Sequence, residues 1–195
     1  MTAAWDGRSD FYEDDEPIEA VHSVVRRAPD AVSGRRPSVR DVGAALLVRL
    51  PVTPVDGWKL QKLCYLVQAR CLAHTGLPAF HEPIEAWTHG PVVDSLYQTH
   101  RGQSAITAVP GNADLVAQDD VLVGVINTVI DEFGEWTGKQ LRELTHSQQP
   151  WLEARRGLRP NERSRRHLKP ATMREYFRLI DALPDDDAED DSFPW

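Results

Sequence analysis

Two cysteines and a histidine are of types that could bind a metal, and they lie close together in the sequence. Cys64, Cys71 and His74 follow one another at spacings of seven and three residues, which place them near one face of a helix. A zinc site needs about four ligands at short local spacings such as C-x-x-C, and the sequence contains no such pair. Both cysteines also share an apolar stripe with leucines, so we interpret them as small core side chains and predict no metal site.

His146 is the residue most suggestive of catalysis, because it directly follows Thr145 and such a pair could activate a nucleophile. No acid adjoins it in the sequence to orient the imidazole. A histidine is favourable at a helix C-terminus, so we interpret Thr145 and His146 as residues that hold the end of a helix before Pro150 and Trp151. The motifs G-x-G-x-x-G, G-K-[ST] and G-x-S-x-G do not occur. We therefore expect no catalytic residue, no cofactor and no enzyme activity, and an enzyme that uses His146 is the weakest alternative.

Basic side chains gather between residues 155 and 169. Arginine clusters can neutralise phosphates, which gives a nucleic-acid-binding regulator as the alternative function. The segment lacks interleaved aromatic residues, and no helix-turn-helix pattern precedes it, so we expect nucleic acid to be an unlikely partner. A solvated loop, or a docking surface for an acidic protein or for the chain's own tails, fits better. The basic residues are Arg155, Arg156, Arg159, Arg163, Arg165, Arg166 and Lys169.

Charge is distributed unevenly along the 195 residues, whose formal net charge is -8. Residues 1–20 carry seven acids and one base, and residues 184–195 carry six acids and no base, so the remaining body is +4. We interpret residues 1–37 as a disordered or weakly helical acidic extension and residues 184–195 as an acidic tail, which leaves residues 38–183 as the domain. No apolar run is long enough to span a membrane, and the first residues lack the apolar stretch of a secretory signal. We expect a cytoplasmic protein with reduced cysteines.

Periodicity and capping signals predict the elements that must position these side chains. Ser38 with Asp41, and Thr137 with Gln140, have the spacing of capping boxes at helix starts. Gly76 gives the clearest helix stop. Residues 81–87 look extended and could pair with 79–80 as a small hairpin, and residues 103–117 look like a loop. The fold class is therefore mostly α, a single compact domain of six to seven helices with one small β-hairpin or extended element. The expected helices span 38–50, 56–75, 90–102, 119–133 and 137–146, with a further turn at 151–156 and a last helix from 170.

Several motifs occur in an order that resembles a known family. They are KLQKLCY at 59–65, GLPAF at 76–80, EPIEAW at 82–87, HGPVV at 89–93, LY at 96–97, LTH at 144–146 and PW at 150–151. This series resembles the Panacea domain of the SocA-like antitoxins, over about residues 38–183. The matched residues are mainly apolar or aromatic residues, glycine and proline, which build a scaffold more readily than an active site. We expect the scaffold to include Leu60, Gln61, Leu63, Trp87, Gly90, Pro91, Thr145, His146, Pro150 and Trp151.

The resemblance implies a function. Panacea proteins are antitoxins that neutralise a cognate protein toxin by direct contact, and SocA resembles an adaptor that delivers its toxin to a Clp-type protease. The expected contact residues are polar or aromatic members of the motifs that the core stripe does not need, joined by two arginines from a region where the family is often more apolar. They are Lys59, Lys62, Tyr65, His89 and Tyr97, with Arg165 and Arg166 adding specificity.

Overall fold

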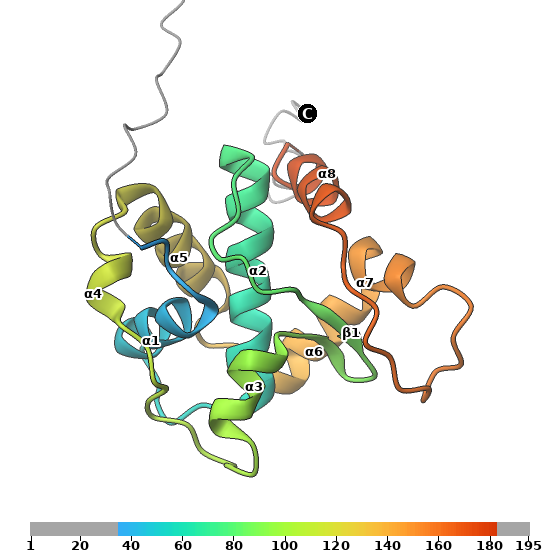
Figure 1. Cartoon of the computed structure of the whole chain (residues 1–195), viewed down its shortest axis with the longest axis horizontal. Coiled ribbons are helices and arrows are strands. Elements are labelled where there is room, and N and C mark those ends of the chain that lie inside the picture. Colours follow the sequence, from blue (N-terminus) through green and yellow to red (C-terminus); the bar gives the residue numbers. More distant parts are fainter. Residues whose placement is uncertain (1–34, 183–195) are drawn as a thin grey trace, which may run out of the picture. The chain divides into compact units, whose positions relative to one another are not determined.

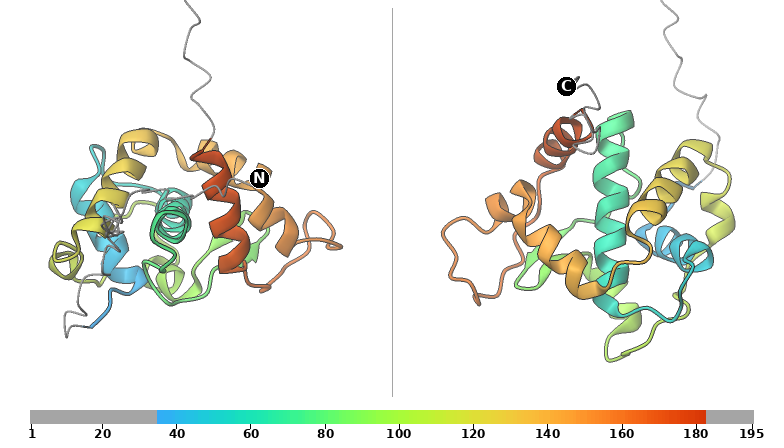
Figure 2. Two further views of the ribbon diagram at one scale, coloured as in Figure 1. Left: turned by 90° about the horizontal axis from the view of Figure 1, so that it is seen from above. Right: turned by 180° about the vertical axis from the view of Figure 1, so that it is seen from behind.

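Helix α2, Gly57–Thr75, is the centre of the fold in the computed structural model, which describes residues 35–182 (Figure 1). Figures 1 and 2 show α1 and α5 on one side of α2 and α8 on the other. The mostly α prediction is confirmed. The described residues form eight helices, more than the six or seven expected, because a short helix occurs at 113–116, within the stretch 103–117 that was expected to be a loop. The turn expected at 151–156 is a short helix at 149–154. The elements around α2 are α1 (Val39–Arg49), β1 (Glu85–Trp87), β2 (Gly90–Val92), α3 (Asp94–His100), α4 (Ala113–Val116), α5 (Asp120–Phe133), α6 (Gly138–Ser147), α7 (Gln149–Ala154) and α8 (Pro170–Ile180).

Local signals explain where α2 begins and ends. The Asp56 carboxylate accepts a hydrogen bond from the backbone N–H of Lys59 at 2.8 Å, and Gly76 closes the helix with a φ of 75°. Every residue from Lys59 to Leu72 is buried, because neighbouring helices surround this helix on all sides. Cys64 and Cys71 lie in this core as expected, with free thiols.

The two strands form an antiparallel hairpin in which Ala86 lies opposite Pro91. This corrects two expectations: residues 90–91 form a strand and do not begin a helix, and the partner of residues 85–87 is 90–92 rather than 79–80. Gly90 has a φ of 100°, which ends the turn after His89, and α3 begins only at Asp94. The other edge of β1 is bonded to residues 166–168. The Ala86 N–H donates to the Arg166 carbonyl and the Leu168 N–H donates to the Ile84 carbonyl, both at 2.8 Å.

Both expected capping boxes are present. At the start of α1 the Ser38 N–H donates to the Asp41 carboxylate at 2.8 Å, and at the start of α6 the Thr137 N–H donates to the Gln140 side chain at 2.9 Å. The helices in the described part of the chain include none with the length and apolar character needed to cross a membrane. The predictions made for residues 1–34 and 183–195 lie outside the described residues.

Replacing Thr137 with alanine is expected to lower the free energy of unfolding by about 1 kcal/mol, because the Gln140 N–H loses its 3.2 Å bond to the hydroxyl. Thr128→Ala is the matched control: Thr128 is exposed in the middle of α5, and its loss should change stability by less than about 0.5 kcal/mol. Urea unfolding of both variants checks this. Equal midpoints for the two variants would contradict the capping role.

Candidate functional site

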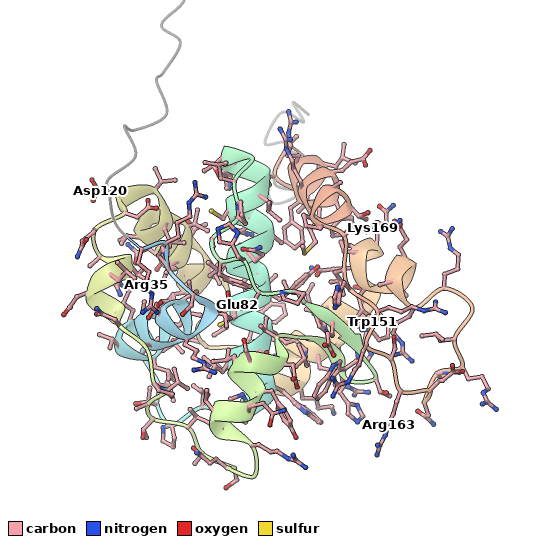
Figure 3. The ribbon with its side chains drawn as sticks, in the orientation of Figure 1. Arg35, Glu82, Asp120, Trp151, Arg163 and Lys169 are labelled. Carbon is pink, nitrogen blue, oxygen red and sulfur yellow. The ribbon has the colours of Figure 1, made fainter. Side chains whose placement is uncertain are left out.

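A groove of about 1400 Å³ opens beside the N-terminal end of α2. Five stretches form its walls: the start of α2, the hairpin, α3 with the residues after it, the start of α6, and the loop between α7 and α8. The hairpin and α3 follow one another directly, and the other stretches lie further apart in the sequence. Figure 2 shows this loop beside the hairpin, and Figure 3 labels Arg163 on it. We call this site the basic groove. Its residues include Asp56, Trp58, Trp87, His89, Asp94, Tyr97, Arg101, Thr137, Gly138, Lys139, Arg163 and Arg165.

Positive charge dominates the rim of the basic groove. Its four exposed cations are Arg101, Lys139, Arg163 and Arg165, and none of them forms an ion pair with an acid of the described residues. The two acids of the groove have local partners. Asp56 caps α2 and packs against Gly138, and Asp94 accepts a bond from Gln98 at 3.0 Å. The groove therefore presents cationic charge that the described residues do not neutralise.

Aromatic rings form the floor of the basic groove. Trp58 is 43% exposed, and its ring centroid lies 5.5 Å from that of His89. The Arg142 guanidinium lies over the same indole at 5.7 Å. Trp87 and Tyr97 meet edge to face with centroids 5.0 Å apart. These contacts hold the rings in place, so the floor is rigid and apolar beneath a basic rim.

A buried cation lies directly beneath this floor. The Lys62 side chain is fully buried, and its Nζ donates to the Pro91 carbonyl at 3.0 Å. Burial, with the nearby charge of Arg142, lowers the pKa of Lys62 to about 7. This hydrogen bond thus links the buried Lys62 side chain of α2 to the backbone of β2.

Three expected contact residues are not at the surface, which corrects that expectation. Lys62 and Tyr65 are fully buried, and Lys59 is 6% exposed with its Nζ donating to the Gly134 carbonyl at 2.6 Å. Tyr65 packs edge to face against Phe177, with ring centroids 6.0 Å apart. The physical reason is the central position of α2, which leaves no face of the helix in water between residues 59 and 72.

The other four expected contact residues are accessible. His89 and Arg165 are exposed, Tyr97 is half-buried, and all three line the basic groove. Arg166 is exposed but lies outside the groove, where its guanidinium donates to the Arg156 carbonyl at 2.9 Å. Lys62 also lines the groove, from its buried position, so the structure brings together four of the seven residues singled out from the sequence.

The expected scaffold residues in α2 join the core to the hairpin. Leu60 and Leu63 are fully buried, and the side-chain Oε1 of Gln61 accepts a hydrogen bond from the Val93 N–H at 2.8 Å. Gln61 is therefore a link between α2 and the end of β2.

The scaffold residues in α6 and α7 support the hairpin from the other side. The Trp151 indole donates to the Trp87 carbonyl at 3.0 Å, and the His146 ring stacks on Trp151 at 4.1 Å. The Thr145 hydroxyl donates to the Arg142 carbonyl at 3.2 Å. Burial and the charge of Arg142 lower the pKa of His146 to about 4, so the ring is neutral in its stack at pH 7.

Arg155 is the most important residue whose role the sequence did not reveal. We expected it in a charged surface cluster, but it is 7% exposed, and its guanidinium lies over the Trp151 ring at 5.2 Å. Its Nη1 donates to the Ala86 carbonyl at 3.0 Å, and its Nη2 donates to the Glu162 carbonyl at 2.8 Å. The spacing of four residues from Trp151 was the available signal, since it places both side chains on one face of a helical segment.

Residues 60–152 match the family model described as "Antitoxin SocA-like, Panacea domain". The resemblance expected from the sequence is confirmed for this range, which is narrower than the 38–183 predicted. The range runs from α2 into α7 and includes the hairpin, α3 and α6, but it excludes the groove residues 161–165. Searches of curated proteins and of solved structures gave no match.

Proposed function

Because residues 60–152 carry a SocA-like antitoxin (Panacea) domain, which supports a role in a toxin–antitoxin system, we propose that this chain neutralises a cognate protein toxin by direct binding. The basic groove is the contact surface in this proposal. Toxin bound there would be held by the exposed residues of the rim and by the aromatic floor.

The observation that carries the proposal is the origin of the groove walls. The hairpin, α3 and α6 belong to the range that matches the antitoxin family, and they converge on one groove whose rim cations lack acidic partners among the described residues. Protein-binding surfaces usually have an apolar centre and a polar rim, and the groove has an aromatic floor within a charged rim.

Toxin rescue in cells tests the proposal. A reading frame next to this one that arrests growth when expressed alone supplies the toxin, and co-expression of the wild-type chain should restore growth. The double variant Arg101→Glu/Arg165→Glu reverses charge on two walls of the groove and is expected to weaken toxin binding at least tenfold, on the order of 1.4 kcal/mol or more. Fewer colonies should therefore form than with the wild-type chain.

The matched control makes the same change of charge elsewhere. Arg174 and Arg178 are exposed on α8 and do not line the groove, so Arg174→Glu/Arg178→Glu should rescue as well as wild type. Full rescue by the groove variant, at equal protein levels, would remove the groove from the proposal.

The finer mode of neutralisation is either occlusion of the toxin or its delivery to a Clp-type protease, as the family resemblance implies. The half-life of the toxin, measured in cells with and without the protease, separates the two modes.

The alternative function, a nucleic-acid-binding regulator that uses residues 155–169, loses support from the side-chain contacts. Arg155 is committed to backbone carbonyls, Arg159 pairs with Glu162 at 3.5 Å, and Lys169 pairs with Glu153 at 2.8 Å. Binding to the chain's own promoter DNA that falls steeply with salt would favour this alternative.

A further inference from the structure

The loop between α7 and α8 is fixed at both of its ends. We call residues 156–166 the arginine loop. At its start the Arg155 Nη2 donates to the carbonyls of Arg159, Pro160 and Glu162 at 3.2, 3.2 and 2.8 Å. At its end the Arg166 carbonyl accepts from Ala86, so that the chain returns along β1. A guanidinium has five N–H donors in one fixed plane and can therefore bond carbonyls on several sides at once, whereas a lysine offers three donors from a single nitrogen.

Fixing the ends of the arginine loop presents two of its side chains to the groove. Arg163 and Arg165 line the basic groove, and neither forms a side-chain hydrogen bond or an ion pair with the described residues. By contrast, Arg159 and Arg166 in the same loop have partners within it. Two arginines of the loop thus bond to other loop residues, and two line the groove without a bonded partner among the described residues.

We infer that Arg163 and Arg165 form a specificity wall, preset by Arg155, that binds an acidic segment of the partner protein. This inference rests on the proposed function and names the chemistry of its partner. The loop lies beyond residues 60–152, so it is a part of the groove that the family match does not cover. Because the bonds from Arg155 order the loop before the partner arrives, the loop loses no further conformational freedom on binding, and binding is stronger for that reason.

The groove suits an acidic protein segment better than a nucleic acid. Single-stranded nucleic acids bind through aromatic faces on which bases stack. Here Arg142 lies over one face of the Trp58 indole, and Tyr97 is packed edge to face against both Trp87 and His100. Asp56 and Asp94 on the groove walls would also repel a continuous run of phosphates, whereas a peptide can place its carboxylates only where the cations lie.

The experiment measures binding of a defined probe by the full chain. Poly-L-glutamate and a duplex DNA of equal total charge are titrated at two salt concentrations, with Trp fluorescence as the signal. Arg163→Glu/Arg165→Glu should weaken poly-L-glutamate binding at least tenfold, while the α8 control Arg174→Glu/Arg178→Glu should change it less than twofold. Equal losses for the two variants would show that only net charge matters and would overturn the inference. Tighter, loop-dependent binding of DNA would overturn it as well, in favour of a nucleic-acid partner.

Arg155→Met tests the preset wall separately. Hydrogen exchange of the Ala86 and Glu162 amides, whose acceptors are the carbonyls of Arg166 and Arg159, should quicken at least tenfold, while amides of α2 keep their protection. Poly-L-glutamate binding should fall, and adding the Arg163 and Arg165 changes should weaken it little further. Arg156→Met, at an exposed position in the same loop, is the matched control and should change neither measurement.

Unchanged exchange in Arg155→Met would overturn the positioning role. None of these measurements needs the toxin. If the wild-type chain binds poly-L-glutamate but does not rescue cells from the toxin, the proposed function alone is contradicted. If Arg163→Glu/Arg165→Glu binds poly-L-glutamate as well as the wild-type chain does, this inference alone is contradicted.

Discussion

Gly90→Ala is expected to lower the free energy of unfolding by about 4 kcal/mol. Gly90 has a φ of 100°, which costs an L-residue about 1–2 kcal/mol. A Cβ there would also lie 2.5 Å from the Lys62 Cε and 3.1 Å from the Thr145 hydroxyl, and both side chains are fully buried. The core beneath the hairpin would have to shift, and such overpacking costs a further 1–3 kcal/mol or so.

Gly102→Ala separates backbone strain from crowding. Gly102 has a similar φ of 82°, but no atom lies within 4 Å of where its Cβ would be. Its replacement should cost only the backbone term, about 1 kcal/mol. Urea unfolding of both variants, followed by far-ultraviolet circular dichroism, gives the two free energies. If Gly90→Ala and Gly102→Ala lose similar free energies of unfolding, the Lys62 side chain must accommodate the added methyl group at residue 90 without cost.

The second large effect is a pH dependence that comes from Lys62. Its pKa is 10.5 as a free side chain and about 7 in the fold, so between these values the unfolded chain binds more protons than the folded chain. Stability must therefore rise with pH across this range: the cost of burying the charge is complete below about pH 7 and has vanished above pH 10.5. Relative to Lys62→Met, the wild-type chain should gain about 2 kcal/mol of unfolding free energy between pH 7 and pH 9.

Measuring the difference between wild type and variant cancels the other titrating groups. Urea unfolding at pH 7, 8 and 9 gives the two curves, and Lys139→Met is the control because Lys139 is exposed at the rim. The gap between wild type and Lys139→Met should stay constant with pH. A constant gap for Lys62→Met as well would show that Lys62 remains charged in the fold, with a partner other than the Pro91 carbonyl.

The residues of α2 show where inference from sequence failed. The apolar stripe from Leu60 to Cys71 correctly predicted a helix, but the lysines beside the stripe were expected at the surface. An amphipathic pattern indicates one face of a helix that must be buried. It does not indicate whether other elements cover the remaining faces. In this fold α5, α6 and α8 cover them, so Lys59 and Lys62 donate to backbone carbonyls in the interior.

The arginine segment shows the same limit of inference from sequence, because residues of one type have different environments in the fold. Seven basic residues between 155 and 169 look alike in the sequence, yet Arg155 is buried among carbonyls, whereas Arg163 and Arg165 are exposed in the groove. Their different roles depend on where the hairpin carbonyl of Ala86 lies, a residue 69 positions away from Arg155.

The sequence by itself determined the features that depend on neighbours within a few residues. These are the capping boxes at Ser38 and Thr137, the stop at Gly76, the mostly α character of the chain and the motif series that matches the antitoxin family over residues 60–152. Only the tertiary structure decided that residues 90–92 are a strand, that Lys62 is buried and that five separate stretches form one basic groove. The physical reason is that caps, stops and periodicity are local interactions, whereas burial and a shared groove depend on which distant elements pack together.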